Sequence, residues 1–181
     1  MQSTLEQIIG SGKSNEMREA TPAVPLLEFI YKNAPFTVQV ERRPRVNRGD
    51  KSDFPIVKFS VIDKDGVPRG KIIGELKRDP RDQSLTFKSS YLKNDQVQEE
   101  FMRVEKAPGH IGGIMRETIA QLLLQGAVGT WISTSGVLLE GGNKTYEALL
   151  VDPRLTGEKK LLSEKDSDEN DRFQYKLTKK P

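Results

Sequence analysis

The stretch FMRVEKAPGHIGGIMRETIAQLLLQG, residues 101–126, decides the fold because an apolar pattern, clustered glycines and possible chemistry coincide in it. Residues 101–105 predict a short strand, and residues 107–113 predict a glycine-containing turn. A mostly apolar stripe at three- and four-residue spacing then predicts a helix packed on one side, closed by Gly126; its members are Ile111, Ile114, Met115, Thr118, Ile119, Leu122 and Leu123. Free peptide N–H groups at the start of a helix favour an anion, so a phosphate-bearing cofactor is the first functional hypothesis.

Alternating apolar and polar residues upstream of this stretch predict four consecutive strands joined by short turns, as in an antiparallel meander. These strands cover residues 36–41, 56–62, 71–77 and 84–92. Downstream, the pattern predicts a strand over residues 130–135, a helix over residues 141–150 capped at Asn143, and a last strand over residues 172–177. The expected fold class is α+β, with a mixed, mostly antiparallel central sheet and flanking helices.

The domain organisation follows from length and composition. At 181 residues the chain suits one domain that can bury a core. Residues 1–25 are small and polar with two prolines, and we expect a flexible N-terminal arm followed by a single domain over residues 26–181. Residues 10–14, GSGKS, are similar to the end of a phosphate-binding P-loop, but Gln7 occupies the place of its first glycine, so we interpret them as a flexible segment.

Composition excludes several classes of function. The chain has no cysteine, which excludes disulfides, thiolate catalysis and zinc sites built on sulfur. Its single histidine, His110, excludes a multi-histidine metal site, and we expect no metal. No apolar run is long enough to span a membrane and no secretory leader is visible, so a soluble, cytoplasmic protein is expected. The net charge of +3 comes from largely alternating basic and acidic residues, so nucleic-acid binding is not predicted.

A basic segment, residues 42–51 with the sequence RRPRVNRGDK, follows the first strand of the meander. It could grip an acidic partner or a cofactor phosphate. A solvated loop is the favoured interpretation, because the run is short and no aromatic residue is interleaved for base stacking.

The order of elements, together with residues 104–113, resembles the GNAT acyltransferases. Val104 to Gly112 resembles the strand and pyrophosphate loop of that family, and residues 111–113 match the end of its arginine-or-glutamine, glycine, glycine pattern. Ala107 and His110 stand where the family has its arginine or glutamine and its first glycine. The resemblance implies that two neighbouring parallel strands admit the pantetheine arm of acetyl-CoA and that peptide N–H groups hold its diphosphate. The implied cofactor-binding residues are Met102, Arg103, Val104, His110, Ile111, Gly112, Gly113 and Ile114.

Residues 145–150, TYEALL, resemble the aromatic-tyrosine-glutamate-x-leucine helix of the same family. By that resemblance Tyr146 is the general acid for the departing thiolate, although a tyrosine on an amphipathic helix is more often a core or rim residue. A carboxylate lodged in a strand can take the proton of the incoming amine, which makes Glu75 and Glu105 candidate bases. Each also fits a solvent-facing strand position. His110 could touch a phosphate or act as a base, or be simply exposed.

These features favour an acyl-CoA-dependent N-acyltransferase that uses acetyl-CoA as co-substrate and a small-molecule or protein amine as acceptor. The alternative is a non-catalytic interaction module that uses residues 42–51 to engage an acidic partner. An effector domain is a third possibility that no residue selects. Acceptor pockets are built from loops without a general code, so the sequence identifies neither the acceptor nor the oligomeric state.

Overall fold

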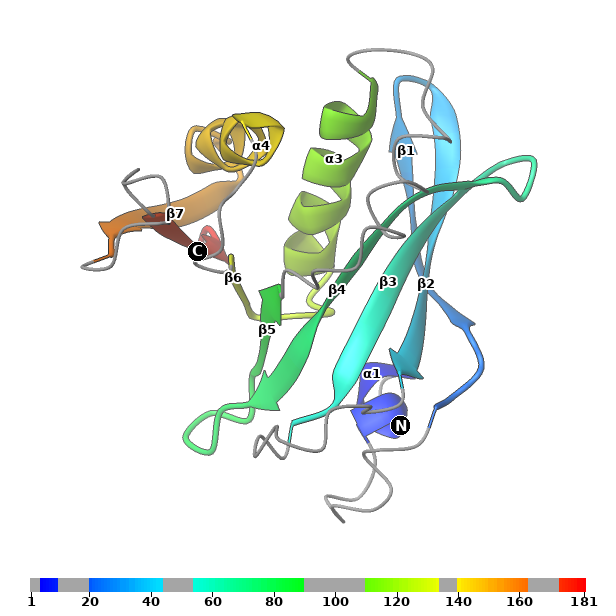
Figure 1. Ribbon diagram of the computed structural model, residues 1–181, viewed down its shortest axis with the longest axis horizontal. Helices are drawn as coiled ribbons and strands as arrows, with labels where there is room; N and C mark the ends of the chain where they lie inside the picture. Colours follow the sequence, from blue (N-terminus) through cyan, green and yellow to red (C-terminus); the bar gives the residue numbers. More distant parts are fainter. Residues whose placement is uncertain (1–3, 10–19, 44–53, 90–109, 134–139, 163–172) are drawn as a thin grey trace.

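The computed structural model describes residues 4–9, 20–43, 54–89, 110–133, 140–162 and 173–181 (Figure 1). The helices in these ranges are α1 (Thr4–Ile9), α3 (His110–Leu124) and α4 (Glu140–Leu150). The strands are β1 (Val24–Tyr31), β2 (Ala34–Arg43), β3 (Ile56–Asp63), β4 (Pro68–Arg78), β5 (Leu85–Ser89), β6 (Thr130–Ile132), β7 (Leu155–Leu161) and β8 (Phe173–Lys179). The strand expected over residues 101–105 lies outside the described residues.

The antiparallel meander predicted from the alternating pattern is confirmed, and β1 extends it by one strand. Neighbouring strands from β1 to β5 all pair antiparallel. Along β2 every second residue from Phe36 to Arg42 is buried, because successive side chains point to opposite faces of a sheet. Lys32 and Asn33 both have positive φ in the turn between β1 and β2, as a two-residue hairpin whose twist matches its strands requires.

The eight strands form one sheet in the order β1-β2-β3-β4-β5-β6-β8-β7, with β1 and β7 at its edges. Only β5 and β6 are parallel neighbours, and they pair through residues 86–88 and 130–132. Helix α3 lies in the connection between these two strands, as a crossover between parallel strands requires. The sheet is therefore mixed and mostly antiparallel, as predicted.

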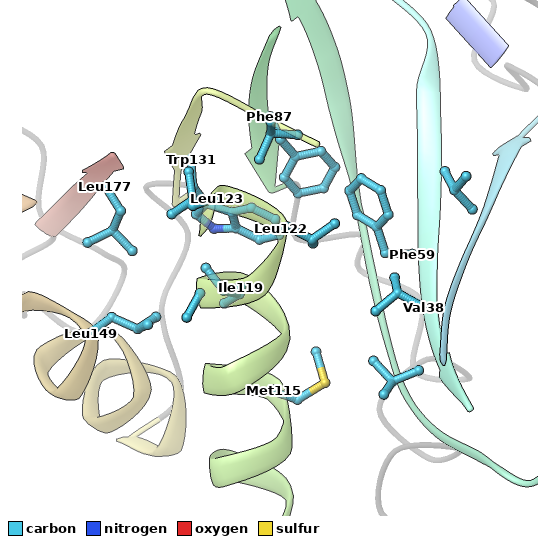
Figure 2. Close-up of a cluster of buried hydrophobic side chains, with 14 of the residues drawn as sticks. Val38, Phe59, Phe87, Met115, Ile119, Leu122, Leu123, Trp131, Leu149 and Leu177 are labelled. Atoms are coloured by element: carbon cyan, nitrogen blue, oxygen red, sulfur yellow. The ribbon is translucent and has the colours of Figure 1, made fainter. Parts of the chain in front are cut away.

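The helices of the described residues share one face of the sheet. Buried residues of α1, α3 and α4 join the inward positions of the strands in a single core cluster. Figure 2 shows its centre, where Phe59, Phe87 and Trp131 lie between α3 and the sheet. The Phe87 and Trp131 ring centroids are 4.3 Å apart. Residues of the three described helices thus contribute to the core on the side of the sheet that carries its buried residues, and the described part of the opposite side presents polar side chains such as Gln39 and Lys58.

The structure corrects the expectation for residues 1–25. Residues 4–9 form α1, and residues 24 and 25 already belong to β1. The α1 side chains Leu5 and Ile8 are only 1% and 5% exposed, and the buried Arg42 guanidinium donates a 2.8 Å hydrogen bond from Nη1 to the Ile8 carbonyl. Where a flexible arm was expected, residues 4–9 thus form a helix, and two apolar residues at i and i+3 give it a buried face.

Candidate functional site

The candidate site lies where the parallel pairing of β5 and β6 ends. The last paired positions are Lys88 and Ile132. On the β5 side, the Ser89 hydroxyl donates to the Ile132 carbonyl at 3.4 Å. Ligands of sheets with parallel strands tend to bind outside the carboxyl ends of those strands, which makes this point a candidate site.

A second serine, Ser133, directly follows β6 and bonds to β8, the neighbour on the other edge of β6. The Ser133 amide donates to the Tyr175 carbonyl at 2.9 Å, as in an ordinary antiparallel pair. The return bond is different, because the Tyr175 amide donates to the Ser133 hydroxyl at 2.8 Å instead of to a backbone carbonyl. Within the described residues, the last bonds on the two edges of β6 therefore involve serine hydroxyls, those of Ser89 and Ser133.

Tyr146 of α4 reaches this point from the helical side of the sheet. Its side chain is 7% exposed. The phenol oxygen accepts a hydrogen bond from the Trp131 indole Nε1 at 3.0 Å, and it lies 3.5 Å from the Ser89 hydroxyl. Tyr146 and Leu149, three residues apart, form the buried stripe of α4 and place the phenol toward the sheet.

The phenol of Tyr146 is a proton donor without a close acceptor in the described structure. Burial raises the pKa of Tyr146, against the opposing effect of its hydrogen bonds with Ser89 and Trp131, so the hydroxyl is protonated at neutral pH. The Trp131 N–H donates to the phenol oxygen and so does not accept the phenol proton. The contact between the Tyr146 and Ser89 hydroxyls, at 3.5 Å, is longer than an ordinary O–H···O bond. A group that arrives at this point with a better acceptor can therefore take the O–H hydrogen bond.

A second tyrosine holds the first in place. The Tyr175 ring stacks on the Tyr146 ring with centroids 5.1 Å apart and planes 14° apart. The Tyr175 hydroxyl donates at 2.7 Å to Glu147, which also pairs with Lys159, and the Lys159 Nζ lies 4.3 Å from the centroid of the Phe173 ring. The hydrogen bond from Lys159, followed by that from Tyr175, lowers the pKa of Glu147. Both tyrosine rings are thus fixed by groups on α4, β7 and β8.

The structure does not bring Glu75 to this site. Glu75 belongs to β4, where it pairs with Ile56 of β3 and with Lys88 of β5. Its neighbours along the strand, Gly74 and Leu76, face inward. Its Cβ therefore points to the sheet face away from the helices, and Tyr146 lies on the helical side. Glu105, the other candidate base, is outside the described residues.

The glycine pattern that was expected in a turn lies inside a helix. Because α3 begins at His110, residues 110–113 form its first turn, whose four amides have no partner within the helix. Ile114 is the first residue whose amide reaches a carbonyl of the helix. Gly113 also has a packing role, since an added Cβ would lie 2.0 Å from the Tyr31 hydroxyl of β1. Met102, Arg103 and Val104 are outside the described residues.

The basic segment of residues 42–51 begins in β2, and residues 44–51 are outside the described residues. Arg42 is 8% exposed and hydrogen-bonded to α1, so its guanidinium serves the fold. The observed geometry therefore does not favour Arg42 as a contact for an acidic partner.

No protein-family model, curated protein or solved structure matches this chain. Function is therefore inferred from the geometry of the site. No helix in the described part of the chain combines the length and the apolar content needed to cross a membrane. Across the described ranges, no group of three or more acidic or histidine side chains is placed to hold a metal ion.

Proposed function

We propose that the protein is an acyl-CoA-dependent N-acyltransferase, related in mechanism to the GNAT acyltransferases, that transfers an acetyl group from acetyl-CoA to an amine. The observation that carries this proposal is the buried O–H of Tyr146 at the carboxyl end of the parallel pair β5 and β6. A neighbouring parallel pair is the feature through which the family that the sequence resembles admits the pantetheine arm. Residues 110–113 are the first residues of α3, and the first amides of an α-helix point out of its N-terminal end, a geometry that suits a diphosphate.

The reaction assigns one task to Tyr146. The amine nitrogen attacks the thioester carbon, the C–N bond forms and the C–S bond breaks, so that negative charge develops on the sulfur. The Tyr146 O–H donates a hydrogen bond to that sulfur and supplies its proton, and the proton lost by the amine returns to the phenol through solvent. Burial keeps the phenol protonated, and the hydrogen bond from the Trp131 N–H fixes its orientation before the sulfur arrives.

The test combines binding with transfer. Calorimetric titration with acetyl-CoA is expected to show saturable binding to the unaltered protein and to Tyr146→Phe alike, because the ring and its stacking remain. Release of CoA thiol to a panel of amines is expected to fall about a hundredfold in kcat in Tyr146→Phe, the effect of removing one donor to a developing charge.

Two outcomes contradict the proposal. Absence of binding heat with millimolar acetyl-CoA removes the transferase assignment altogether. Full activity in Tyr146→Phe removes the role of the phenol. Urea unfolding of the variant is the control, since the substitution is informative only if the fold is retained.

A further inference from the structure

The two edge strands of the sheet differ in how they are protected from pairing with a further strand. Strand β1 carries Pro25, a register shift between Pro25 and Leu27, and the Glu28 carbonyl, which accepts a 2.9 Å hydrogen bond from Gln125 of α3. Proline, bulges and covering groups are devices by which natural proteins block an edge. At the other edge, β7 (LTGEKKL) has no proline and pairs with β8 without a register shift, and no described side chain bonds to its backbone (Figure 1).

The pairing of β7 with β8 determines which backbone groups of β7 face the open edge. Lys159 lies opposite Tyr175, whose amide and carbonyl both bond to Ser133 on the other side of β8. Lys159 and Tyr175 are therefore a pair without mutual hydrogen bonds, and the Lys159 N–H and C=O point to the open edge. This direction alternates along a strand, so the same holds for Gly157 and Leu161. No described residue bonds to these groups, which leaves three alternate residues of β7 ready to pair with another strand.

The charged side chains of β7 are self-complementary in one antiparallel register. When two copies of the strand pair about Lys159, Glu158 of each copy lies opposite Lys160 of the other. Glu158 and Lys160 are exposed, and neither has an ion-pair partner among the described residues. The two Lys159 side chains also lie opposite each other, but each is paired with Glu147 of its own chain, which offsets its charge. Pairing about Glu158 or Lys160 instead would place two like charges without such a partner opposite each other.

The same register covers an exposed apolar side chain. Leu161 is 56% exposed. In the pairing about Lys159 it lies opposite Gly157 of the other copy, on the same face of the sheet, and Gly157 has no side chain to obstruct it. Leu150 reaches over that glycine, with a methyl group 2.6 Å from where a Cβ would lie, and offers an apolar contact to the incoming Leu161. Charge pairing on one face and apolar contact on the other therefore favour one register.

We propose that the protein forms a symmetric dimer in which β7 of two copies pairs antiparallel about Lys159 and joins the two sheets into one. The N–H and C=O groups of Gly157, Lys159 and Leu161 supply the backbone hydrogen bonds, and the two pairs of Glu158 with Lys160 set the register. The dimer requires neither acetyl-CoA nor the Tyr146 hydroxyl, so it is independent of the proposed transferase reaction.

The test is the dissociation constant of the dimer, measured on the full chain by sedimentation equilibrium. The unaltered protein is expected to dimerise reversibly at submillimolar concentration. Glu158→Lys and Lys160→Glu are each expected to weaken the dimer about tenfold, because each change turns two attractive cross-strand pairs into two repulsive ones. Lys64→Glu makes the same charge change as Lys160→Glu in the exposed turn after β3, and as the matched control it should leave dimerisation unchanged.

Mixing the two β7 variants tests the register itself. In a dimer of one Glu158→Lys chain with one Lys160→Glu chain, both cross-strand pairs again have opposite charges. We expect this mixture to dimerise about as tightly as the unaltered protein, which also shows that both variants fold.

Three results would overturn the proposal. The unaltered chain remains monomeric at submillimolar concentration, the dimer persists undiminished in both β7 variants and so uses another surface, or the mixture recovers no affinity. Acetyl-CoA takes part in none of these measurements, so the two proposals fail separately.

Discussion

Two stacked tyrosines with different hydroxyl partners dominate the site at the scale of single residues. Burial raises the pKa of Tyr146, and burial together with Glu147 raises the pKa of Tyr175. An absorbance titration is therefore expected to show ionisation well above the ordinary tyrosine value of 10.0. Tyr146→Phe and Tyr175→Phe should each remove one late-ionising group, and this prediction fails if either variant loses a group that titrates at the ordinary value.

The raised pKa values of Tyr146 and Tyr175 determine how the free energy of unfolding changes with pH. The unfolded chain releases these phenol protons at its ordinary pKa, whereas the folded chain keeps them to higher pH. The stabilisation is therefore complete below the unfolded value and is lost as pH rises through the folded one. The decline in the free energy of unfolding at alkaline pH should be shallower in Tyr146→Phe than in the unaltered protein.

Only part of this site could be predicted from residues taken in order. Tyr146 was predicted from the resemblance of residues 145–150 to a family motif, but its partners Ser89 and Trp131 are 57 and 15 residues away. Tyr175 lies in a strand whose alternating pattern predicts that its side chain is buried, but the pattern does not predict that it stacks on the Tyr146 ring. Which strands meet depends on sheet order, and alternation alone carries no information about sheet order.

At the scale of elements, Arg154 connects α3 to the turn between α4 and β7. Its guanidinium donates to both carboxylate oxygens of Glu117, at 2.9 and 2.8 Å, and to Asp152. The hydrogen bonds from Arg154 are the largest effect that lowers the pKa of Glu117 and of Asp152. Arg154→Ala is expected to lower the free energy of unfolding by about 1 kcal/mol at neutral pH, the size of a partly exposed network.

The loss of stability caused by Arg154→Ala should become smaller as the pH falls. Lowered carboxyl pKa values stabilise the fold above the unfolded values of 4.5 for Glu117 and 3.8 for Asp152, and that stabilisation is lost as pH falls. Urea unfolding at neutral and acidic pH measures it, with Lys179→Ala, an exposed residue of β8, as control. A difference between Arg154→Ala and the unaltered protein that persists undiminished in acid would contradict the role of the ion pairs.

Element boundaries were predictable where the apolar pattern was strong. The alternation in β2 and β3 and the stripe of α3 located those elements. Strand β7, LTGEKKL, was missed because most of its side chains are exposed and Gly157 carries none. Gly157 packs closely there, since an added Cβ would lie 2.6 Å from a methyl group of Leu150, which would have to move. Helix α4 begins at Glu140, so Asn143 lies inside the helix and is not its cap.

For the whole molecule, the docking of α1 joins the first residues to strands far along the chain. Leu5 is 1% exposed in the same core cluster as Val38 and Val40 of β2. Leu5→Ala is expected to lower the free energy of unfolding by about 3 kcal/mol through lost burial and a residual cavity. Gln7→Ala, an exposed position on the same helix, is the matched control and should change it by less than about 0.5 kcal/mol. Equal stability of the two variants would exclude α1 from the cooperative fold.

The architecture at this scale could be predicted only in outline. The class of sheet followed from the meander and the strand, helix, strand order. The placement of α1, α3 and α4 on one face did not, because amphipathic helices carry no sign of which face they cover.

The contact between Trp131 and Tyr146 has an optical consequence. Trp131 is the single tryptophan of the chain, so all indole fluorescence originates beside the candidate site. The emission of an indole changes when its N–H loses an oxygen partner or when an electron-rich sulfur approaches. The protein thus carries a built-in fluorophore at the point where catalysis is proposed, and site occupancy can be followed without attaching a label.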